Sequence, residues 1–296
     1  MTNSLPGILD LHMHSTVSDG TDSPAEILAN VKAAGIGFFS LTDHDAVQGC
    51  EALLALLAPG DPLFIPGVEF SCKDELGKYH ILGYAYDPAS PSIRAVVAQG
   101  HALRMQKVRQ RLEMLGTEYG FRFPEQEIRA LLSLSNPGKP HIAKLMVKFG
   151  YAESKEQAFH EFLNKLRVKA GHVRPEEAIR GILGAGGIPV LAHPPYGDGD
   201  QLILGGDLDA RTARLREFGL QGLEGYYSGF SAVLRDQVLH LEEKYGLYVT
   251  AGSDYHGKNK LIPLADTGLE PGAEPAEGLR RFCADVLGDK RPEAAP

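Results

Sequence analysis

The sequence predicts an α/β fold, a (β/α) barrel of about seven strands with a helical insertion after the fourth strand. Short apolar runs alternate with segments of helical periodicity along most of the chain, which favours a mostly parallel sheet. One long central stretch has helical periodicity without a strand pattern, which indicates the insertion.

Each predicted strand is an apolar run that ends in a polar or ionisable residue: Ile8–Leu11, Phe38–Leu41, Leu63–Val68, His80–Tyr84, Ile188–Ala192, Gly222–Tyr226 and Tyr248–Ala251. Predicted helices lie between most of them: Pro24–Ala34, Ala46–Leu57, Leu208–Glu217 and Ala232–Tyr245. Gly35, Gly219 and Gly246 stand where helices usually stop.

The insertion covers about Pro91 to Gly187, with five predicted helices: Ile93–Leu115, Glu125–Leu134, His141–Phe149, Lys155–Leu166 and Pro175–Gly184. A long βα loop opens on the face of a barrel that carries active sites. We therefore expect residues 91–187 to form a lid and specificity domain over a metal-binding barrel of residues 1–90 and 188–296. The tail from about Glu270 is expected to add little beyond a short helix at Leu279–Leu287.

The composition is that of a folded soluble protein, with 43% apolar and 23% charged residues. A net charge of −8 argues against a broad surface for long duplex nucleic acid. It permits a small anionic substrate, because bound cations make an acidic pocket locally positive. Three scattered cysteines and the absence of an export or membrane segment in the sequence favour a cytoplasmic location.

Histidines and carboxylates follow the predicted strands. The first strand runs into His12-Met13-His14, and residues i and i+2 of a strand share a face, so both imidazoles can reach one metal ion. A solvated loop with incidental histidines is the alternative. After the second strand, His44 can bind a metal ion. Asp43 can hydrogen-bond to a metal-binding histidine and orient it. Alternatively, Asp43 or Asp45 can cap the next helix.

The later strands repeat this pattern. Glu69 follows a strongly apolar run, where a carboxylate needs a partner, and it can bridge two ions. His80 taken alone is better explained as an ordinary strand histidine, and only the neighbouring motifs favour a ligand. His193 precedes two prolines that prevent strand continuation, and Asp254 and His256 stand at i and i+2 after the seventh strand. Six of the eleven histidines thus fall near one rim, which chance does not explain.

Taken together, the motifs His12-Met13-His14 with Asp19, Asp43-His44-Asp45, Glu69 with His80, His193 and Asp254-Tyr255-His256 resemble those of the polymerase-and-histidinol-phosphatase (PHP) family, related to the amidohydrolases. The resemblance covers essentially the whole chain. It implies a distorted seven-stranded TIM-like barrel and two or three divalent ions, most simply Mn²⁺, with Fe²⁺ or Zn²⁺ as alternatives. The mixed nitrogen and oxygen ligands independently suit these metals.

The resemblance also implies a division of ligands. His12, His14, Glu69 and Asp254 would surround one ion, Glu69, His80 and His193 a second, and Asp19, His44 and His256 a third. A metal-bridging hydroxide would then attack phosphorus. We expect His193 or Asp254 to stand nearest the leaving oxygen as proton donor.

Candidate substrate contacts are basic or hydroxyl residues: Arg104, Lys107, Arg111, Lys139, His141 and Ser228. The first three share a helix face that can hold a second phosphate, or they form an ordinary solvated face. Lys139 and His141 stand just ahead of a predicted helix. This position can bind an anion, or the segment is an ordinary connection from a loop to a helix.

The insertion and its Gly-Lys-Pro-His-Ile loop resemble the nucleotide-acting branch of the family. The expected activity is hydrolysis of the 3′-phosphate of nucleoside 3′,5′-bisphosphates, such as pAp, to the 5′-monophosphate. A 5′–3′ exonuclease acting on short oligonucleotides is the main alternative. A histidinol-phosphate phosphatase and a non-catalytic metal-binding module are less favoured.

Overall fold

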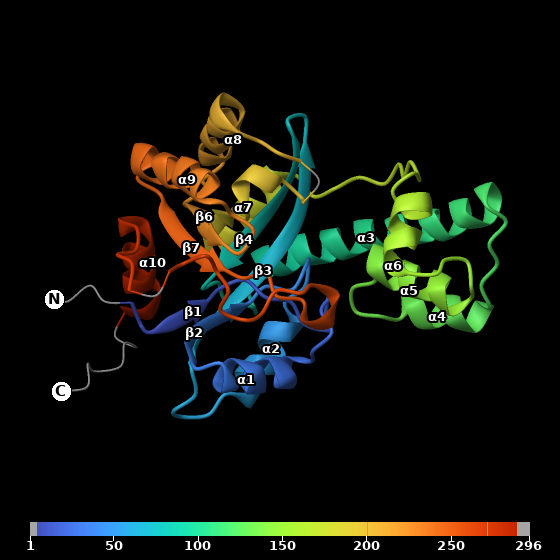
Figure 1. Cartoon of the computed structure of the whole chain (residues 1–296), viewed down its shortest axis with the longest axis horizontal. Coiled ribbons are helices and arrows are strands. Elements are labelled where there is room, and N and C mark those ends of the chain that lie inside the picture. The colour runs from blue at the N-terminus through green and yellow to red at the C-terminus, as the bar shows by residue number, and fades with distance from the viewer. Residues whose placement is uncertain (1–4, 200, 271, 289–296) are drawn as a thin grey trace.

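The computed structural model describes residues 5–199, 201–270 and 272–288. Seven strands form one sheet in chain order (Figure 1). They are β1 Ile8–Asp10, β2 Ile36–Leu41, β3 Leu63–Asp74, β4 Gly77–Tyr84, β5 Ile188–Leu191, β6 Gly222–Tyr227 and β7 Tyr248–Gly252. Every predicted apolar run is therefore a strand.

The sheet is parallel except around β4. The pairs β1–β2, β2–β3, β5–β6 and β6–β7 are parallel, as predicted, whereas β4 runs antiparallel to both β3 and β5. The cause is the short turn between Asp74 and Gly77, because two strands joined by so few residues must run in opposite directions. Gly77 has a φ of 139°, which a side chain would disfavour.

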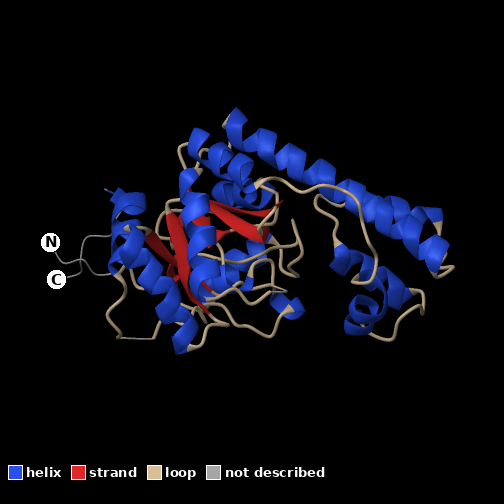
Figure 2. Ribbon diagram, turned by 90° about the horizontal axis from the view of Figure 1, so that it is seen from above, coloured by secondary structure: helices blue, strands red, loops and turns tan. Residues whose placement is uncertain are grey.

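Outside the segment between β4 and β5, the helices around the sheet are α1 Pro24–Ala33, α2 Gln48–Leu56, α8 Gly205–Glu217, α9 Ala232–Tyr245 and α10 Glu277–Leu287. Figure 2 shows the strands enclosed by helices. The α1 helix begins with a capping box, in which Ser23 accepts from the Glu26 amide and Glu26 accepts from the Ser23 amide. The predicted cap of α2 by Asp43 or Asp45 is wrong, because Val47 occupies that position without a side-chain bond.

Between β4 and β5 the chain forms α3 Pro91–Glu118, α4 Glu125–Leu132, α5 Lys139–Lys148, α6 Lys155–Gln157, a π-helix Ala158–Leu163 and α7 Pro175–Gly184. The long α3 carries this helical segment away from the sheet (Figure 1). Within the described ranges, no helix has the length and hydrophobicity to cross a membrane.

The helical segment is divided between two apolar clusters. Ile93 and Val96 of α3 pack with the residues of β3, β4 and α7. Farther along α3, Val108 belongs to a separate cluster with Ile142 and Met146 of α5. The outer part therefore has its own core, while the two ends of the segment share the core of the sheet.

The C-terminal helix contributes more than the sequence suggests. Leu279 and Phe282 of α10 are fully buried, and the Phe282 ring packs on Tyr84 with centroids 5.5 Å apart. The helix predicted at Leu279–Leu287 is α10, which begins at Glu277 and covers the sheet beside β7. Positions 271 and 289–296 of that tail lie outside the described residues.

Candidate metal centre

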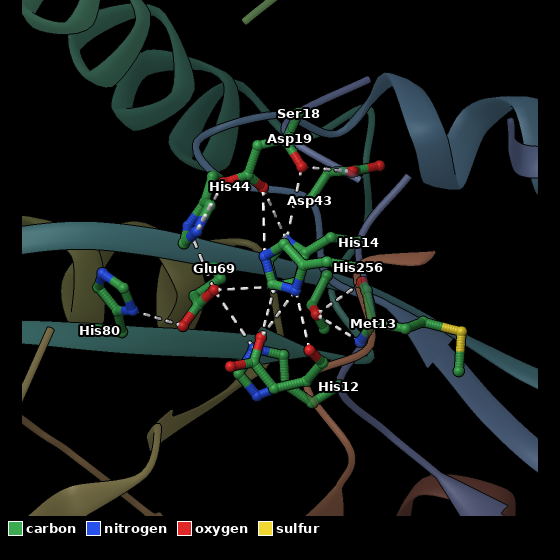
Figure 3. Close-up of polar contacts among 12 residues, drawn as sticks. His12, Met13, His14, Ser18, Asp19, Asp43, His44, Glu69, His80 and His256 are labelled. Atoms are coloured by element: carbon green, nitrogen blue, oxygen red, sulfur yellow. Dashed lines mark hydrogen bonds and ion pairs between the residues drawn. The ribbon is translucent and has the colours of Figure 1, made fainter. Parts of the chain in front are cut away.

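The nine side chains predicted as metal ligands converge in space. Figure 3 shows Glu69 among His12, His14, His44 and His80. Its Oε2 atom is 3.2 Å from His12 Nε2, 3.1 Å from His14 Nε2 and 3.2 Å from His44 Nδ1. Its Oε1 atom faces other imidazoles, at 2.8 Å from His80 Nδ1 and 3.4 Å from His193 Nε2. The two oxygens thus serve different sets of histidines, which is the geometry of a bridging carboxylate.

Two aspartates complete the cluster. Asp254 Oδ1 lies 3.4 Å from His14 Nε2 and 3.3 Å from His256 Nδ1. Asp19 Oδ1 lies 3.4 Å from His256 Nε2, and Asp19 Oδ2 is 4.0 Å from His44 Nε2.

Three groups have ligand atoms mutually within 4.8 Å: His12, His14 and Asp254; His44, Glu69 and His80; and His14, Asp19, His44 and His256. The first group contains three of the four residues expected around the first ion. The third group contains the three residues expected around the third ion, together with His14. His44 also joins the group of Glu69 and His80, whereas His193 is in none of the three and has its Nε2 3.3 Å from His80 Nδ1. The division of ligands among ions therefore remains a prediction.

The backbone adopts unusual conformations to present these groups. His193 and Asp254 have φ values of 28° and 58°, a region that costs non-glycine residues of the order of 1 kcal/mol or more. Hydrogen bonds hold both residues there. The Asp254 amide donates to the His12 carbonyl at 2.8 Å, and the His193 amide donates to Glu224 at 2.8 Å.

The donor set fits divalent cations. Several buried polar atoms of the cluster make no well-aligned hydrogen bond within the described part of the chain, although most of them face another of the predicted ligands at 2.8–3.4 Å: His12 Nε2, His14 Nε2, Asp19 Oδ1, His44 Nδ1, Glu69 Oε1 and His193 Nδ1. Leaving one such atom unsatisfied costs about 1–3 kcal/mol, so a group of them in one place indicates a missing partner. Nitrogen and carboxylate ligands without thiolates are those of Mn²⁺, Fe²⁺ or Zn²⁺.

The electrostatics agree with this assignment. Burial lowers the pKa of the His12 imidazole, but the carboxylates of Glu224, Glu69 and Asp254 outweigh it and hold the pKa well above its ordinary value. The pKa of Glu69 lies well below its usual range despite burial, chiefly because of His80 and His12. Protons on imidazoles thus balance the carboxylate charge, and bound cations would replace those protons.

A carboxylate that was not among the predicted site residues contacts two of the predicted ligands. Glu224, on β6, is fully buried; its Oε1 lies 2.9 Å from His12 Nδ1, and its Oε2 accepts from the His193 amide. Such a contact fixes the tautomer and orientation of a ligating imidazole. The available signal was an acidic residue inside an otherwise apolar strand.

Two further aspartates fix the loops. Asp10 accepts from the Ser253 hydroxyl at 2.6 Å and joins the ends of β1 and β7. Asp43 accepts from the Ser18 hydroxyl at 2.6 Å, and that hydroxyl lies 3.4 Å from His14 Nδ1. Asp43 was expected to orient a histidine directly, whereas in the structure it reaches His14 through the Ser18 hydroxyl.

A basic cavity adjoins the metal cluster. The pocket at the cluster has a volume of about 310 Å³ and shares His80, Asp198, Gly199, Tyr227 and Lys260 with a cavity of about 1450 Å³. Arg104, Lys107 and Arg111 all line the larger cavity. Burial together with the nearby Arg104 lowers the pKa of Lys107 to about 8 and that of Arg111 to about 10. Arg104 is paired with Asp45 at 2.5 Å.

The other predicted substrate contacts lie differently. Lys139 lines the cavity and donates to Asn164 at 2.9 Å. Lys139 and His141 are in the first turn of α5 rather than ahead of the helix, and His141 Nδ1 accepts from the Gly138 amide. Ser228 donates to the Ser253 carbonyl at 3.1 Å and is not among the described residues that line either cavity.

No family model matches the chain. A 3′,5′-nucleoside bisphosphate phosphatase of Chromobacterium violaceum is 33% identical over 263 residues, covering 84% of this chain and 87% of the relative. A 5′-3′ exoribonuclease of Haemophilus influenzae is 30% identical over 254 residues, covering 83% and 89%. A phosphoribosyl 1,2-cyclic phosphate 1,2-diphosphodiesterase of Eggerthella lenta is 28% identical over 266 residues, covering 86% and 97%.

Two solved structures are similar along nearly the whole chain. One, from Bifidobacterium adolescentis, is described as a metal-dependent phosphoesterase and superposes with a TM-score of 0.78 at 26% identity, covering 94% of this chain and 96% of that one. The other is an amidohydrolase of Chromobacterium violaceum with bound sulfate, with a TM-score of 0.77 at 26% identity and coverage of 95% and 97%.

Proposed function

The chain belongs to the PHP family of metal-dependent phosphoesterases, in its nucleotide-acting branch, and from this premise we propose that it hydrolyses the 3′-phosphate of nucleoside 3′,5′-bisphosphates such as pAp. The products are the nucleoside 5′-monophosphate and phosphate. The observation that carries the proposal is the basic cavity that opens beside the ligand cluster. A bisphosphate needs two anion sites, and the cluster and the face of Lys107 and Arg111 supply them.

We propose that the cluster binds two or three divalent ions, with Mn²⁺ as the first choice. His12, His14, Asp254 and Glu69 would hold one, Glu69, His80 and His193 another, and Asp19, His44 and His256 the third. Bound there, such ions supply Lewis acidity and a nucleophilic water at neutral pH.

Within the chain, His193 is the better placed proton donor of the two candidates. The Oδ2 atom of Asp254 already accepts from Tyr227 and Lys260. His193 Nδ1 has no partner within the described residues. We therefore propose that Asp254 holds the cluster and that His193, when it does not bind an ion, carries the proton of the leaving alkoxide.

We further propose that the sheet closes as a distorted seven-stranded barrel and that the helical segment of residues 91–187 is its lid. The Leu11 amide donates to the Ala251 carbonyl at 2.9 Å, which supports closure between β1 and β7. Asn136 donates to the His44 carbonyl, and Lys155 donates to Asn259 at 2.7 Å. These bonds join the helical segment to the loops that carry the predicted ligands.

A second candidate is a 5′–3′ exoribonuclease acting on short RNA. The larger cavity, at about 1450 Å³, exceeds the roughly 300–1,000 Å³ usual for small-molecule sites, so a second nucleotide would fit. The relative from Haemophilus influenzae carries that activity in its name. The net charge of −8 restricts such a substrate to short lengths.

The test compares pAp, a 5′-phosphorylated trinucleotide RNA and histidinol phosphate on Mn²⁺-loaded protein, with products separated by chromatography. We expect 5′-AMP and phosphate from pAp at the highest kcat/KM. Mononucleotide release from the RNA at an equal or higher kcat/KM would instead make the chain an exoribonuclease.

A variant series tests the second anion site. Lys107→Met and Arg111→Met should raise the KM for pAp by about tenfold, since each removes a charged contact, and leave the KM for 3′-AMP unchanged. Arg109→Met is the matched control, because Arg109 is exposed on the same helix and does not line the cavity. Equal effects on both substrates would refute a separate site for the 5′-phosphate.

A further inference from the structure

Lys260 occupies the junction of the two cavities. It follows the short 3₁₀ turn Gly257–Asn259 and lines both the pocket at the ligand cluster and the larger cavity. Among the described residues that line the cluster pocket, it is the single Lys or Arg. Its side chain is 38% exposed and contributes to the walls of both cavities.

The position of Lys260 is fixed by the loop before it. The Lys258 amide donates to the Thr21 hydroxyl at 2.9 Å, and Asn259 donates to the Asp19 carbonyl at 2.7 Å. Gly257 has a φ of 63°, and a Cβ there would overlap Thr21 Oγ1, so this close approach requires glycine. The loop is therefore held against the segment that carries Asp19.

The two oxygens of Asp254 have separate partners. Oδ1 faces the imidazoles of His12, His14 and His256, whereas Oδ2 accepts from Lys260 at 2.5 Å and from the Tyr227 hydroxyl at 3.0 Å. A cation on the Oδ1 side would draw on the charge of this carboxylate and leave the ammonium of Lys260 incompletely neutralised.

The ammonium also has donors to spare. A lysine ammonium carries three N–H donors, and the Asp254 contact uses one. A phosphate in the cluster pocket would lie beside the carboxylates of Glu69 and Asp254, which repel it, and Lys260 is the cation of the pocket wall that can offset this repulsion.

We propose that Lys260 is a catalytic residue, which donates a hydrogen bond to a non-bridging oxygen of the scissile phosphate and counters its charge in the transition state. The proposal rests on the phosphoesterase activity of the proposed function and not on which nucleotide is the substrate. The competing explanation is that Lys260 only neutralises and orients Asp254.

Three variants separate these explanations. Lys260→Met removes the charge, and Lys260→Arg restores a cation with different geometry. Tyr227→Phe removes the other hydrogen bond to the same oxygen of Asp254 and keeps the ammonium. Lys258→Met is the control for net charge, because Lys258 is exposed two residues away. Each Mn²⁺-loaded protein is assayed with p-nitrophenyl phosphate, titrated calorimetrically with inorganic phosphate, and analysed for metal per chain.

We expect Lys260→Met to lower kcat/KM by about 10²-fold, comparable to the loss of one transition-state donor, and to weaken inorganic phosphate binding at least tenfold with metal content unchanged. Lys260→Arg should recover part of both losses, and Lys258→Met should keep phosphate affinity within about twofold. Tyr227→Phe, which loosens Asp254 but keeps the ammonium, should lose less phosphate affinity than Lys260→Met. Unchanged phosphate affinity in Lys260→Met, or a loss of metal that accounts for its lost activity, would overturn the proposal. Failure of the unsubstituted protein to release phosphate from any ester would overturn the proposed function and with it the catalytic role of Lys260, while the calorimetric titration would still show whether Lys260 binds phosphate.

Discussion

Glu224 contacts two predicted ligands at once, through the ring of His12 and the amide of His193. Replacing Glu224 with Gln keeps the shape and removes the charge. The amide can donate to His12 Nδ1 and so favour the wrong tautomer. We expect a 10- to 100-fold loss of Mn²⁺ affinity, the usual effect of removing such a partner. Titration of the apoprotein with Mn²⁺ measures it, with the exposed Glu243→Gln as control. Equal affinities of the two variants would contradict the assignment.

Lys107 gives the larger cavity a dependence on pH. Burial, with Arg104 and Arg111 nearby, lowers its pKa from 10.5 to about 8, only partly opposed by Asp45, and His172 faces it from another segment. Because the folded pKa is the lower one, the unfolded chain binds more protons between these values. The contribution of Lys107 to the free energy of unfolding therefore rises with pH in that window.

The Lys107→Met variant tests this sign. At pH 7 it should be more stable than the unsubstituted protein, because it no longer buries an ammonium, and the difference should shrink as the pH rises from about 8 towards 10. Urea unfolding at several pH values measures it. A stability difference that does not vary with pH would contradict the lowered pKa.

Single residues also show what the sequence can and cannot reveal about a site. His12 and His14, or Asp254 and His256, are recognisable because two ligating types recur at strand spacing. Glu224 and Lys260 stand alone in the sequence, and only the fold brings Glu224 to His12 and Lys260 to Asp254. Their roles therefore could not be predicted from local spacing.

At the scale of elements, the β3–β4 hairpin explains the position of His80. The alternating pattern predicted a parallel sheet in which ligands follow strand ends. Because β4 runs antiparallel, His80 lies opposite Ser71 within the ladder and diagonally across from Glu69. The sequence did not predict this hairpin, because the residues between Val68 and His80 include several polar ones and resemble a loop between two separate strands.

The contact between the ends of β7 and β1 makes a second testable element. Gly252 ends β7, and a Cβ there would overlap His12 Cβ and lie 2.7 Å from Glu224 Oε1. We expect Gly252→Ala to cost about 1–3 kcal/mol of stability through overpacking and also to weaken Mn²⁺ binding, because His12 and Glu224 must move.

Chemical denaturation and metal titration of the Gly252→Ala variant measure both effects. Gly206→Ala in α8 is the matched control, since a Cβ there meets no atom within 4 Å and the change should be neutral or slightly stabilising. Normal Mn²⁺ affinity in Gly252→Ala would show that the approach of these strands does not position His12.

At the scale of the whole molecule, total charge and local charge differ in sign. The net charge of −8 argues against a large basic surface, yet Lys73, Lys78, Lys107, Arg111 and Lys260 all line one cavity. Composition gives the sum of the charges, whereas their distribution depends on the path of α3 and the β3–β4 hairpin. The basic wall of this cavity was therefore predicted from the sequence only in part, as Arg104, Lys107, Arg111 and Lys139.

The separation of apolar cores predicts where bound metal stabilises the protein. All nine predicted ligands come from the sheet and its loops, and none from α4, α5 or α6. The outer cluster of Val108, Ile142 and Met146 is distinct from the clusters of the sheet. A ligand at 100 times its Kd adds about 2.7 kcal/mol to the stability of the unit that binds it.

Chelation of the bound metal should therefore lower the melting temperature and speed hydrogen exchange in β1 and β7, while the amides of α5 around Ile142 exchange at unchanged rates. Mass-spectrometric exchange with and without Mn²⁺ measures this, with Asp254→Asn as the control that should respond less to the metal. Equal acceleration in α5 and β7 would mean that the outer helices and the sheet unfold as one unit, contrary to the division of their cores.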